Sequence, residues 1–411
     1  MAEHRVVITG MAGFSPLGLD WDSARSAFED NRSGVRYTPE WEKISDLGTK
    51  LSAPVPDFVL PDTYTRKKTR AMGRVSLMAV RVSELALEDA GLLGDPELGD
   101  GRTGVAYGSS SGCTQAIKEF TELLITNSTG GMNSTSYLRM MPHTTAAGIS
   151  MHFGLKGRII PTSSACTSGS QGIGYAYESI RMGRVQRMVA GGAEGLCPSQ
   201  AAVFDMLYAA SRRNDAPTST PAPFQHGRDG LVVGEGACSF VLERLDDALA
   251  RGAHIHAEIV GFGSTCDGAH ATRPDTHTME ATMRLALEDA GLEPAQIGYV
   301  CAHGTATDQG DVAESQATAR VFGKVPVSSL KGHMGHTLGA CGALESWYTV
   351  QMLNNGRFAP TLNLSEVDPQ CGELDYIMGS PRALHMEYAM NNNFAFGGVN
   401  SSLIFRRWRG A

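Results

Sequence analysis

One cysteine and two histidines stand where catalysis by a nucleophile would need them. Cys166 lies in S-S-A-C-T-S-G, between an apolar stretch typical of a buried strand and the start of a helix. His303 lies in A-H-G-T-A-T at an expected strand end, and His336 lies in K-G-H-M-G-H at a helix start. A thiol and two histidines at strand ends of an α/β fold suit acyl transfer through a covalent intermediate. The helix start is expected to lower the pKa of the thiol, because the helix dipole favours the thiolate.

Charged residues near the histidines are candidates for orienting them. Lys331 precedes His336, and Asp311 and Glu314 follow His303 in a glycine-containing stretch. Such residues are usually solvated surface charges. Here a lysine–glutamate pair would orient the imidazoles and set their protonation. The spacing of the cysteine and histidines is not that of a compact metal-ligand set, so no metal is expected.

A second nucleophile motif competes with this interpretation. The segment G-S-S-S-G at 108–112 has the G-x-S-x-G pattern with Ser110 at its centre, directly after an expected strand. A serine hydrolase using Ser110 is therefore the alternative, and a plain Gly/Ser loop is the simpler one. There is no G-x-x-x-x-G-K-[ST] loop or strand-linked G-x-G-x-x-G, so the sequence predicts no nucleotide cofactor and no cofactor of another kind.

The elements that would position these residues occur twice. The eight residues L-A-L-E-D-A-G-L stand at 85–92 and again at 285–292, each at the end of an amphipathic helix that an apolar strand follows. Each half also opens with a strand that we expect to end in glycine, at 5–10 and 257–263. The chain is therefore predicted to be α/β, with pseudo-repeated halves at 1–251 and 252–411 related by a pseudo-twofold axis.

Two segments crowded with Gly, Ala and Ser, after Cys166 and after His336, are predicted to be helices with unusually small faces. Glycine inside a helix costs about 1 kcal/mol relative to alanine, so close packing is the expected compensation. We expect these helices to lie between two sheets in a layered αβαβα arrangement. The pseudo-symmetry would then bring Cys166 and both histidines together.

Composition narrows the class of protein. The 411 residues carry a net charge of -8, which argues against nucleic acid as a partner because a phosphate backbone needs a basic face. The eight cysteines form no C-x-x-C pair, so free thiols in a reducing cytoplasm are expected. The charged N-terminus precedes a strand and not a signal-peptide core, and no apolar run approaches about 20 residues, so no membrane insertion is expected.

Taken together, the motifs resemble those of the elongating type II β-ketoacyl-acyl-carrier-protein synthases, which have the thiolase fold. The resemblance runs from about Arg5 to Phe405. It is carried by six segments: S-A-C-T-S-G at Cys166, V-A-G-G-A-E at 189–194, R-D-G-L-V-V-G-E-G at 228–236, A-H-G-T-A-T-D-Q-G-D at 302–311, S-S-L-K-G-H-M-G-H at 328–336 and N-N-F-A-F-G-G at 392–398.

The resemblance implies a decarboxylative condensation. Cys166 would take an acyl group from a carrier-protein thioester, and a malonyl carrier thioester would then lose carbon dioxide and attack it as an enolate. His303 and His336 would stabilise the enolate, and the backbone N–H groups of Cys166 and Phe396 would form the oxyanion hole.

Other positions match by the same resemblance. Lys331, Asp311 and Glu314 would be the support network. Thr305 and Thr307 would contact the phosphopantetheine arm. Phe396, with Asp267, would belong to the gate between the cysteine and the acyl pocket.

The resemblance also implies an acyl carrier protein as partner. Basic residues at the corresponding places are Lys67, Lys68, Arg70 and Arg213; the alternative is an ordinary basic loop. A homodimer is expected, and a heterodimer stays open.

Two departures concern the gate. The family usually has Gly where this chain has Ala395, and Ser where it has Asn393. Because alanine resists positive φ, gate motion is expected to differ. Acyl preference, and the choice between fatty acid synthesis and a polyketide or aryl-polyene-type pathway, stay open. A noncatalytic partner subunit is the further alternative, and the presence of Cys166 argues against it.

Overall fold

A computed structural model describes residues 3–410 and contains a mixed sheet of 11 strands. The first half of the chain supplies β1 (Val6–Phe14), β4 (Thr103–Gly108), β5 (Ile159–Thr162), β6 (Arg187–Glu194) and β7 (Gly236–Arg244). The second half supplies β8 (Ala257–Cys266), β9 (Ile297–Cys301), β10 (Pro326–Ser328), β12 (Asp375–Tyr376), β14 (Tyr388–Ala395) and β15 (Val399–Arg407). Two short pairs stand apart, β2 (Arg36–Tyr37) with β3 (Leu51–Ser52) and β11 (Arg357–Phe358) with β13 (Arg382–Ala383).

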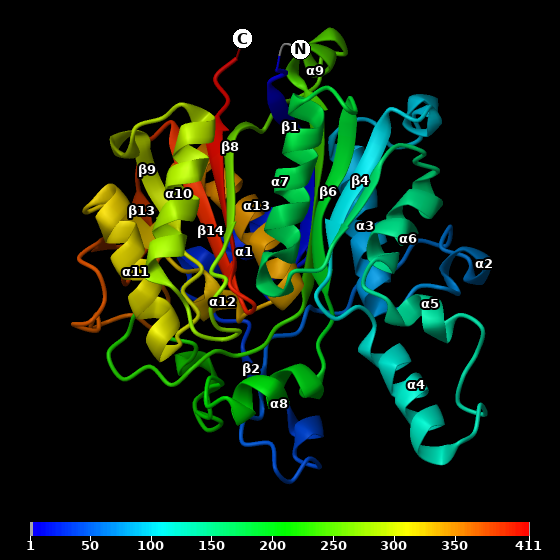
Figure 1. Cartoon of the computed structure of the whole chain (residues 1–411), viewed down its shortest axis with the longest axis horizontal. Coiled ribbons are helices and arrows are strands. Elements are labelled where there is room, and N and C mark those ends of the chain that lie inside the picture. The colour runs from blue at the N-terminus through cyan, green and yellow to red at the C-terminus, as the bar shows by residue number, and fades with distance from the viewer. Residues whose placement is uncertain (1–2, 411) are drawn as a thin grey trace.

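Each half forms one arm of this sheet. The strand order is β12-β10-β9-β14-β15-β8-β1-β7-β6-β4-β5, so within this sheet strands of the two halves pair with each other only where β8 meets β1 (Figure 1). That joint is antiparallel and has three residue pairs, those of Val6, Val7 and Ile8. Beyond the joint the arms separate, which leaves room for helices between them.

Thirteen α-helices accompany the sheet in the described residues. Those of the first half are α1 (Trp21–Glu29), α2 (Arg66–Thr69), α3 (Arg74–Asp89), α4 (Thr114–Thr126), α5 (Ser136–Met140), α6 (Thr144–Phe153), α7 (Ser168–Arg181), α8 (Pro198–Met206) and α9 (Leu245–Ala250). Those of the second half are α10 (Thr276–Ala290), α11 (Asp308–Phe322), α12 (Lys331–Met334) and α13 (Cys341–Asn355). None of these helices has both the length and the apolar composition needed to cross a membrane.

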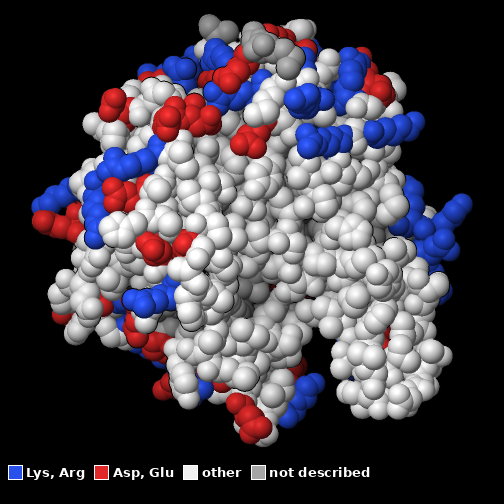
Figure 2. All heavy atoms as spheres, viewed as in Figure 1, with Lys and Arg blue, Asp and Glu red and all other residues white. Residues whose placement is uncertain are grey.

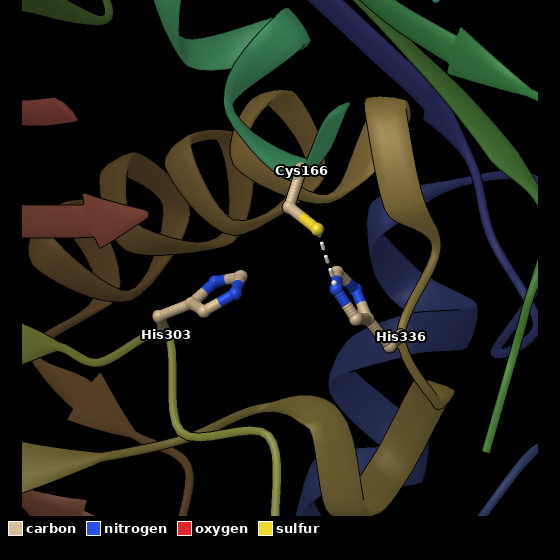
Figure 3. A group of neighbouring side chains, drawn as sticks. All are labelled: Cys166, His303 and His336. Carbon is tan, nitrogen blue, oxygen red and sulfur yellow. Dashed lines mark hydrogen bonds between the residues drawn. The ribbon is translucent and has the colours of Figure 1, made fainter. Parts of the chain in front are cut away.

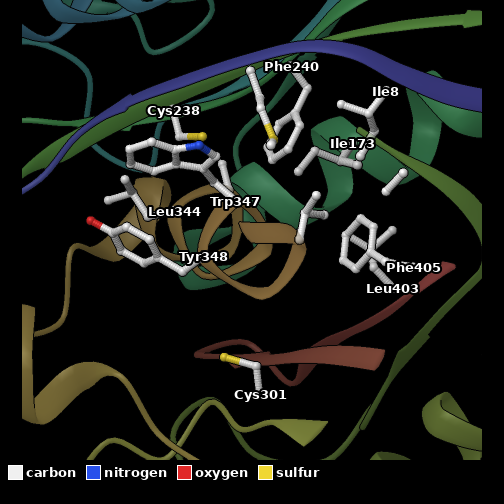
Figure 4. Packing of buried hydrophobic residues seen from close by; sticks show 14 of the residues in the cluster. Ile8, Ile173, Cys238, Phe240, Cys301, Leu344, Trp347, Tyr348, Leu403 and Phe405 are labelled. Atoms are coloured by element: carbon white, nitrogen blue, oxygen red, sulfur yellow. The ribbon is translucent and has the colours of Figure 1, made fainter. Parts of the chain in front are cut away.

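The two helices with small faces, α7 and α13, are the central pair. Each packs against strands of both arms. A Cβ on Gly169 of α7 would lie 2.9 Å from the backbone nitrogen of Ala343 in α13, so glycine is what lets the helices approach. On their other faces Ile173, Leu344 and Trp347 enter the largest apolar core (Figure 4). The predicted layered α/β arrangement is confirmed.

The repeated eight residues have the same structural task in both halves. They form the C-terminal ends of α3 and α10. The backbone of α3 lies directly against that of β1, and the backbone of α10 lies directly against that of β8. A Cβ on Gly10 would lie 2.1 Å from the Ala86 carbonyl oxygen, and one on Gly261 would lie 2.3 Å from that of Ala286. The prediction that glycine ends each opening strand is wrong, because β1 continues to Phe14 and β8 to Cys266. The glycines lie inside the strands, where a helix passes too close for a side chain.

Candidate active site

A strained turn presents Cys166. The residue belongs to a short 3-10 turn, η3 (Ala165–Thr167), between β5 and α7. Ala165 has φ +50°, in the left-handed region that alanine rarely adopts. The turn is held because Ser168 Oγ donates to the Ala165 carbonyl and accepts from the Ser164 N–H at 2.9 Å. It reverses the chain sharply enough to aim the thiol into the space between the halves.

Both histidines reach this thiol from the other half (Figure 3). His336 Nε2 lies 3.0 Å from Cys166 Sγ, and the rings of His303 and His336 stand edge to face with centroids 5.2 Å apart. The sulfur and a nitrogen of each histidine lie within 4.8 Å of one another. The structure thus brings together the three residues predicted to do chemistry.

Donors facing the Nδ1 atoms determine where the histidine protons sit. The Leu338 N–H points at His336 Nδ1 at 3.3 Å. His303 Nδ1 faces Lys331 Nζ at 3.2 Å and Asn393 Nδ2 at 3.3 Å. Because ammonium, amide N–H and backbone N–H groups only donate, both Nδ1 atoms must accept. The ring proton of each neutral histidine is therefore on Nε2, the nitrogen available to the cavity.

The histidines are held neutral. Burial, and then the charge of Lys331, lowers the pKa of both His303 and His336 well below the usual range, and His336 adds to the effect on His303. Two uncharged N–H donors therefore face the cavity near neutral pH.

The expected low pKa of Cys166 is wrong. Burial raises the pKa of this thiol to about 12, which outweighs the helix start. Lys331 and the backbone N–H groups of Phe396 and Cys166 act in the opposite direction and favour the thiolate. Backbone N–H groups that favour the negative charge of the sulfur are also suited to stabilise an oxyanion that develops beside it.

Lys331 has a different partner from the one expected. Its ammonium pairs with Glu345 of α13, and both side chains are fully buried. Burial disfavours the charge, but Glu345 raises the pKa of Lys331 above its usual value. Glu314 instead accepts the backbone N–H groups of His303 and Gly304, both at 2.7 Å. Glu314 therefore holds the backbone of His303, whereas the Lys331–Glu345 pair lies beside Nδ1 of its imidazole.

Asp311 fixes the loop that follows His303. Its carboxylate accepts the N–H groups of Phe224 at 2.7 Å and Thr305 at 2.9 Å, and pairs with Arg228 at 3.4 Å. Burial nevertheless raises the pKa of Asp311 to about 6. The loop places the hydroxyls of Thr305 and Thr307 2.9 Å apart.

A cavity of about 440 Å³ leads to the cysteine. Thr305, Thr307 and Phe396 line it together with the three reactive residues, as do Asp267 and Glu314. The Phe396 ring is partly exposed and packs on Phe204 with centroids 5.3 Å apart. This ring therefore lies directly beside the route to Cys166.

Asp267 anchors the loop behind Phe396. Its carboxylate accepts from Asn400 Nδ2 at 2.7 Å and from the Thr278 hydroxyl, and its N–H donates to the Gly398 carbonyl at 2.8 Å. Gly397 and Gly398 have φ +86° and +71°, so the chain turns at these glycines. Ala395 ends β14 without left-handed strain.

The four predicted basic residues do not line the cavity. Lys67, Lys68 and Arg70 stand exposed on or just after α2, at the right-hand edge in Figure 1, where Figure 2 shows a cluster of positive side chains. Arg213 lies elsewhere, paired with Asp229 at 3.3 Å and donating to the Gly227 carbonyl at 2.9 Å.

Ser110 has the surroundings of a structural residue. Its hydroxyl donates to the buried carboxylate of Glu194, which also accepts the Ser110 N–H at 2.8 Å and the Gly339 N–H at 3.2 Å. A serine nucleophile needs a base that takes its proton, usually a histidine. Glu194 is instead occupied in joining two loops, which removes the basis of the hydrolase alternative.

Within residues 3–410, two clusters have the donor types of a metal site. The first is the reactive trio, and the second combines His303, Cys341 and Glu345 within 4.8 Å. The Lys331 ammonium already supplies a cation to Glu345 and faces His303. A metal ion in the second cluster would be repelled by it.

The sequence analysis assigned no role in the site to Glu345 or Glu194, and it noted Asn393 only as a departure at the gate. Glu345 carried a signal: a charged side chain in a small-faced helix that we expected to lie between two sheets. Such a residue is rarely buried without a partner.

Comparison with known proteins identifies the class. Residues 3–248 match the beta-ketoacyl synthase N-terminal domain, and residues 256–365 match the beta-ketoacyl synthase C-terminal domain. The chain belongs to the β-ketoacyl synthase family, and its layered α/β fold is the thiolase fold predicted from its motifs.

Individual relatives match over the whole chain. A 3-oxoacyl-[acyl-carrier-protein] synthase 2 of Vibrio cholerae is 38% identical over 416 residues, which cover 99% of this chain and 100% of that protein. The crystal structure of a beta-ketoacyl synthase from Burkholderia phymatum has 60% identity and a TM-score of 0.98, covering 99% of this chain and 100% of that one. A type II polyketide ketosynthase in complex with its acyl-carrier protein, bound to the hexaketide, has 29% identity and a TM-score of 0.87, covering 99% and 100% of the chains.

Proposed function

We propose that this protein is a 3-oxoacyl-[acyl-carrier-protein] synthase, an acyltransferase that condenses an acyl group with a malonyl thioester and releases carbon dioxide. The observation that carries the proposal is the cluster of Cys166 with two neutral histidines at the end of one cavity. The names and titles of the full-length relatives agree with this reaction class and with either fatty acid or polyketide synthesis.

In the first half-reaction Cys166 gives up its thiol proton and its sulfur attacks the acyl thioester. The carbon–sulfur bond to the carrier breaks, the departing carrier sulfur takes up that proton and leaves as a thiol, and the acyl group stays on Cys166. The N–H groups of Cys166 and Phe396 stabilise the oxyanion of the tetrahedral intermediate. His336 Nε2–H, 3.0 Å from the sulfur, stabilises the thiolate before attack.

In the second half-reaction the malonyl thioester loses carbon dioxide and its electron pair forms an enolate. The Nε2–H groups of His303 and His336 donate to the enolate oxygen, a charge that is absent in the substrate. The enolate carbon attacks the acyl carbonyl, the bond to Cys166 breaks, and 3-oxoacyl carrier protein leaves. Two neutral donors suit this step, because each keeps its proton.

The cavity accommodates the arm that delivers the substrate. Thr305 and Thr307 lie on its wall, and their hydroxyls can bond the amides of a phosphopantetheine arm. Phe396 and the loop anchored by Asp267 stand between the arm and the acyl chain and act as the gate. No cofactor takes part in the proposed reaction.

An acyl carrier protein in the cytoplasm is the proposed partner. Carrier proteins of this class are acidic, and the exposed Lys67, Lys68 and Arg70 offer complementary charge. Lys67→Glu with Lys68→Glu should raise KM for carrier-bound substrate severalfold, an effect that salt weakens, and leave reaction with a small thioester nearly unchanged. Equal losses with both substrates would contradict a docking role.

A second copy of the chain is the proposed assembly partner. The sheet ends at β5, whose outer edge carries the 43% exposed Ile159. The nearby lobe of α4 and α5 is largely uncharged in Figure 2 and exposes Leu124 and Ile125 by 77% and 74%. Exposed edges and apolar patches of this kind are usually covered. Leu124→Asp should halve the mass measured by light scattering if this surface holds a dimer, whereas an unchanged mass would contradict it.

The reaction itself is tested by mass spectrometry. Wild-type protein incubated with a panel of acyl carrier proteins should gain the acyl mass on Cys166, and malonyl carrier protein should then release 3-oxoacyl carrier protein and carbon dioxide. Cys166→Gln should decarboxylate malonyl carrier protein without condensing it, because the amide resembles an acylated cysteine. Acyl mass on Ser110 would favour the hydrolase alternative.

A further inference from the structure

Three buried side chains, those of Lys331, Glu345 and Asn393, close a ring of polar contacts with His303. Lys331 Nζ lies 3.2 Å from His303 Nδ1 and bonds to Glu345 Oε1. Asn393, on β14, completes the ring: its Nδ2 donates to Glu345 Oε2 at 2.7 Å and lies 3.3 Å from His303 Nδ1. All four side chains are nearly inaccessible to solvent.

The orientation of the Asn393 amide is determined by its neighbours. The carboxylate of Glu345 only accepts, so the amide must turn its NH2 group toward it. On the other side Asn391 Nδ2 donates to Asn393 Oδ1 at 3.1 Å. A Cβ on Gly342 would lie 2.7 Å from Asn393 Oδ1, so a glycine of α13 makes the space for this side chain.

We propose that Asn393 is a positioning residue for the decarboxylation step and acts through His303. Its two amide hydrogens hold Glu345 and His303 Nδ1 at the same time, which keeps the proton of His303 on Nε2. The inference rests on the proposed function, because it assigns a role within that reaction.

The ring of polar contacts shows why His303 needs the neutral amide of Asn393 in addition to Lys331 to keep its proton on Nε2. Without Asn393, Glu345 Oε2 loses its hydrogen bond, and the carboxylate draws Lys331 away from His303. The Nδ1–H tautomer of His303 then competes, and in that tautomer Nε2 has no hydrogen for the enolate. An amide removes this competition without adding charge to a site that already buries an ion pair.

This arrangement is particular to the residue present. The resembling enzymes usually have serine at this position, and a hydroxyl carries one hydrogen on a shorter side chain. A serine can donate to Glu345 or to His303 Nδ1 but not to both. The closed ring therefore depends on Asn393.

The test uses malonyl carrier protein decarboxylation in the Cys166→Gln background. Asn393→Leu keeps the shape and removes both donors, so kcat should fall about tenfold with KM unchanged. Asn393→Ser retains one donor, so its kcat should fall about threefold. This variant replaces Asn393→Leu in the test if the leucine variant does not fold. With Cys166 native, either variant should take up acyl mass within about twofold of the wild-type rate, because acylation does not use His303.

Asn392→Leu is the matched control. Asn392 is equally buried on the same strand, but its side chain faces the other way and accepts from the Ser402 hydroxyl at 2.6 Å. It should leave the decarboxylation kcat unchanged even where it lowers the melting temperature. An unchanged kcat in both folded Asn393 variants, or equal loss of acylation and decarboxylation, would overturn the inference. Failure of Cys166→Gln alone to decarboxylate would instead overturn the proposed function.

Discussion

The turn that presents Cys166 and the turn that precedes α13 have the same backbone shape, but the first carries a reactive side chain and the second carries none. Ala165 and Leu338 begin the 3-10 turns η3 and η6 (Leu338–Ala340) with φ +50° and +49°, and each turn leads into a central helix. The next residue is Cys166 in the first half and Gly339 in the second.

At the position where the first turn presents the Cys166 thiol, the second turn has Gly339, whose N–H donates to the carboxylate of Glu194. A Cβ on Gly339 would lie 2.6 Å from the Ser110 nitrogen and 2.7 Å from Glu194 Oε2. The strained turn is therefore a structural unit that the fold uses twice. It becomes catalytic only where its side chain reaches the cavity and the two histidines.

Giving the first turn the glycine of the second should have the largest effect on activity. Cys166→Gly should abolish both the acyl-enzyme mass and condensation. The melting temperature should change little, because the turn is held by Ser168 and not by the thiol. Intact-mass analysis and calorimetry measure the two outcomes. An acyl adduct on the glycine variant would show that another residue is the nucleophile.

Removing a donor opposite the first turn comes next. His303→Ala and His336→Ala in the Cys166→Gln background should each lower the decarboxylation rate about 10²–10³-fold, as for loss of one oxyanion donor. With native Cys166, the His303 variant should still become acylated. An unchanged rate of carbon dioxide release in either variant would contradict the assigned role.

Adding a methyl group to the second turn tests its packing. Gly339→Ala should lower the free energy of unfolding by about 1–3 kcal/mol, as overpacking of a rigid site does. Denaturant titration measures this, and Gly130→Ala in an exposed loop is the control, because its nearest neighbour would be Ser128 Oγ at 3.4 Å. Equal stability of the two variants would show that the second turn has room for a side chain.

The pH dependence distinguishes the histidines from ordinary ones. The folded-state pKa of His303 is well below the usual value of about 6.5, so its neutral form persists as the pH falls through that value. Protonation of His303 should therefore add no step near pH 6.5 to the decarboxylation rate of Cys166→Gln, whereas steps near pH 8 and pH 6 are expected from Glu314 and Asp311, because burial raises their pKa values to about 8 and about 6. A step near pH 6.5 that remains in Asp311→Asn would mean that burial and Lys331 do not act on the His303 imidazole as described.

The smallest effect is expected at the gate. Ala395 already has strand geometry, and the chain turns at Gly397 and Gly398. Ala395→Gly should therefore speed acylation of Cys166 by no more than about twofold at any chain length, measured by rapid quench with short, medium and long acyl carriers. A larger or length-selective gain would place chain selection at this residue.

The sequence was sufficient for features with a local pattern. The repeated octapeptide predicted two equivalent helices, and the strand and helix signals around Cys166, His303 and His336 predicted where those residues lie. The hydrogen-bond and ion-pair partners of the buried side chains could not be predicted from local patterns. Lys331 of α12 pairs with Glu345 of α13, which the turn η6 between these helices brings to it, and not with Glu314.

Two further errors have the same physical origin. The G-x-S-x-G pattern around Ser110 says nothing of Glu194, which comes from another strand and determines what the serine does. The pKa of Cys166 depends on how completely the two halves exclude water, and burial is a property of the whole fold.

The contact between Cys166 and His336 joins residues 170 positions apart in the chain. At synthesis rates of about 5–20 residues per second, the cysteine leaves the ribosome about 10–30 s before its histidine. A nascent chain therefore carries a thiol without its donors until the second half docks on the first. Thioesters in the cell meet a competent nucleophile only after translation has passed His336, so the split of the site between the halves also sets when reactivity begins.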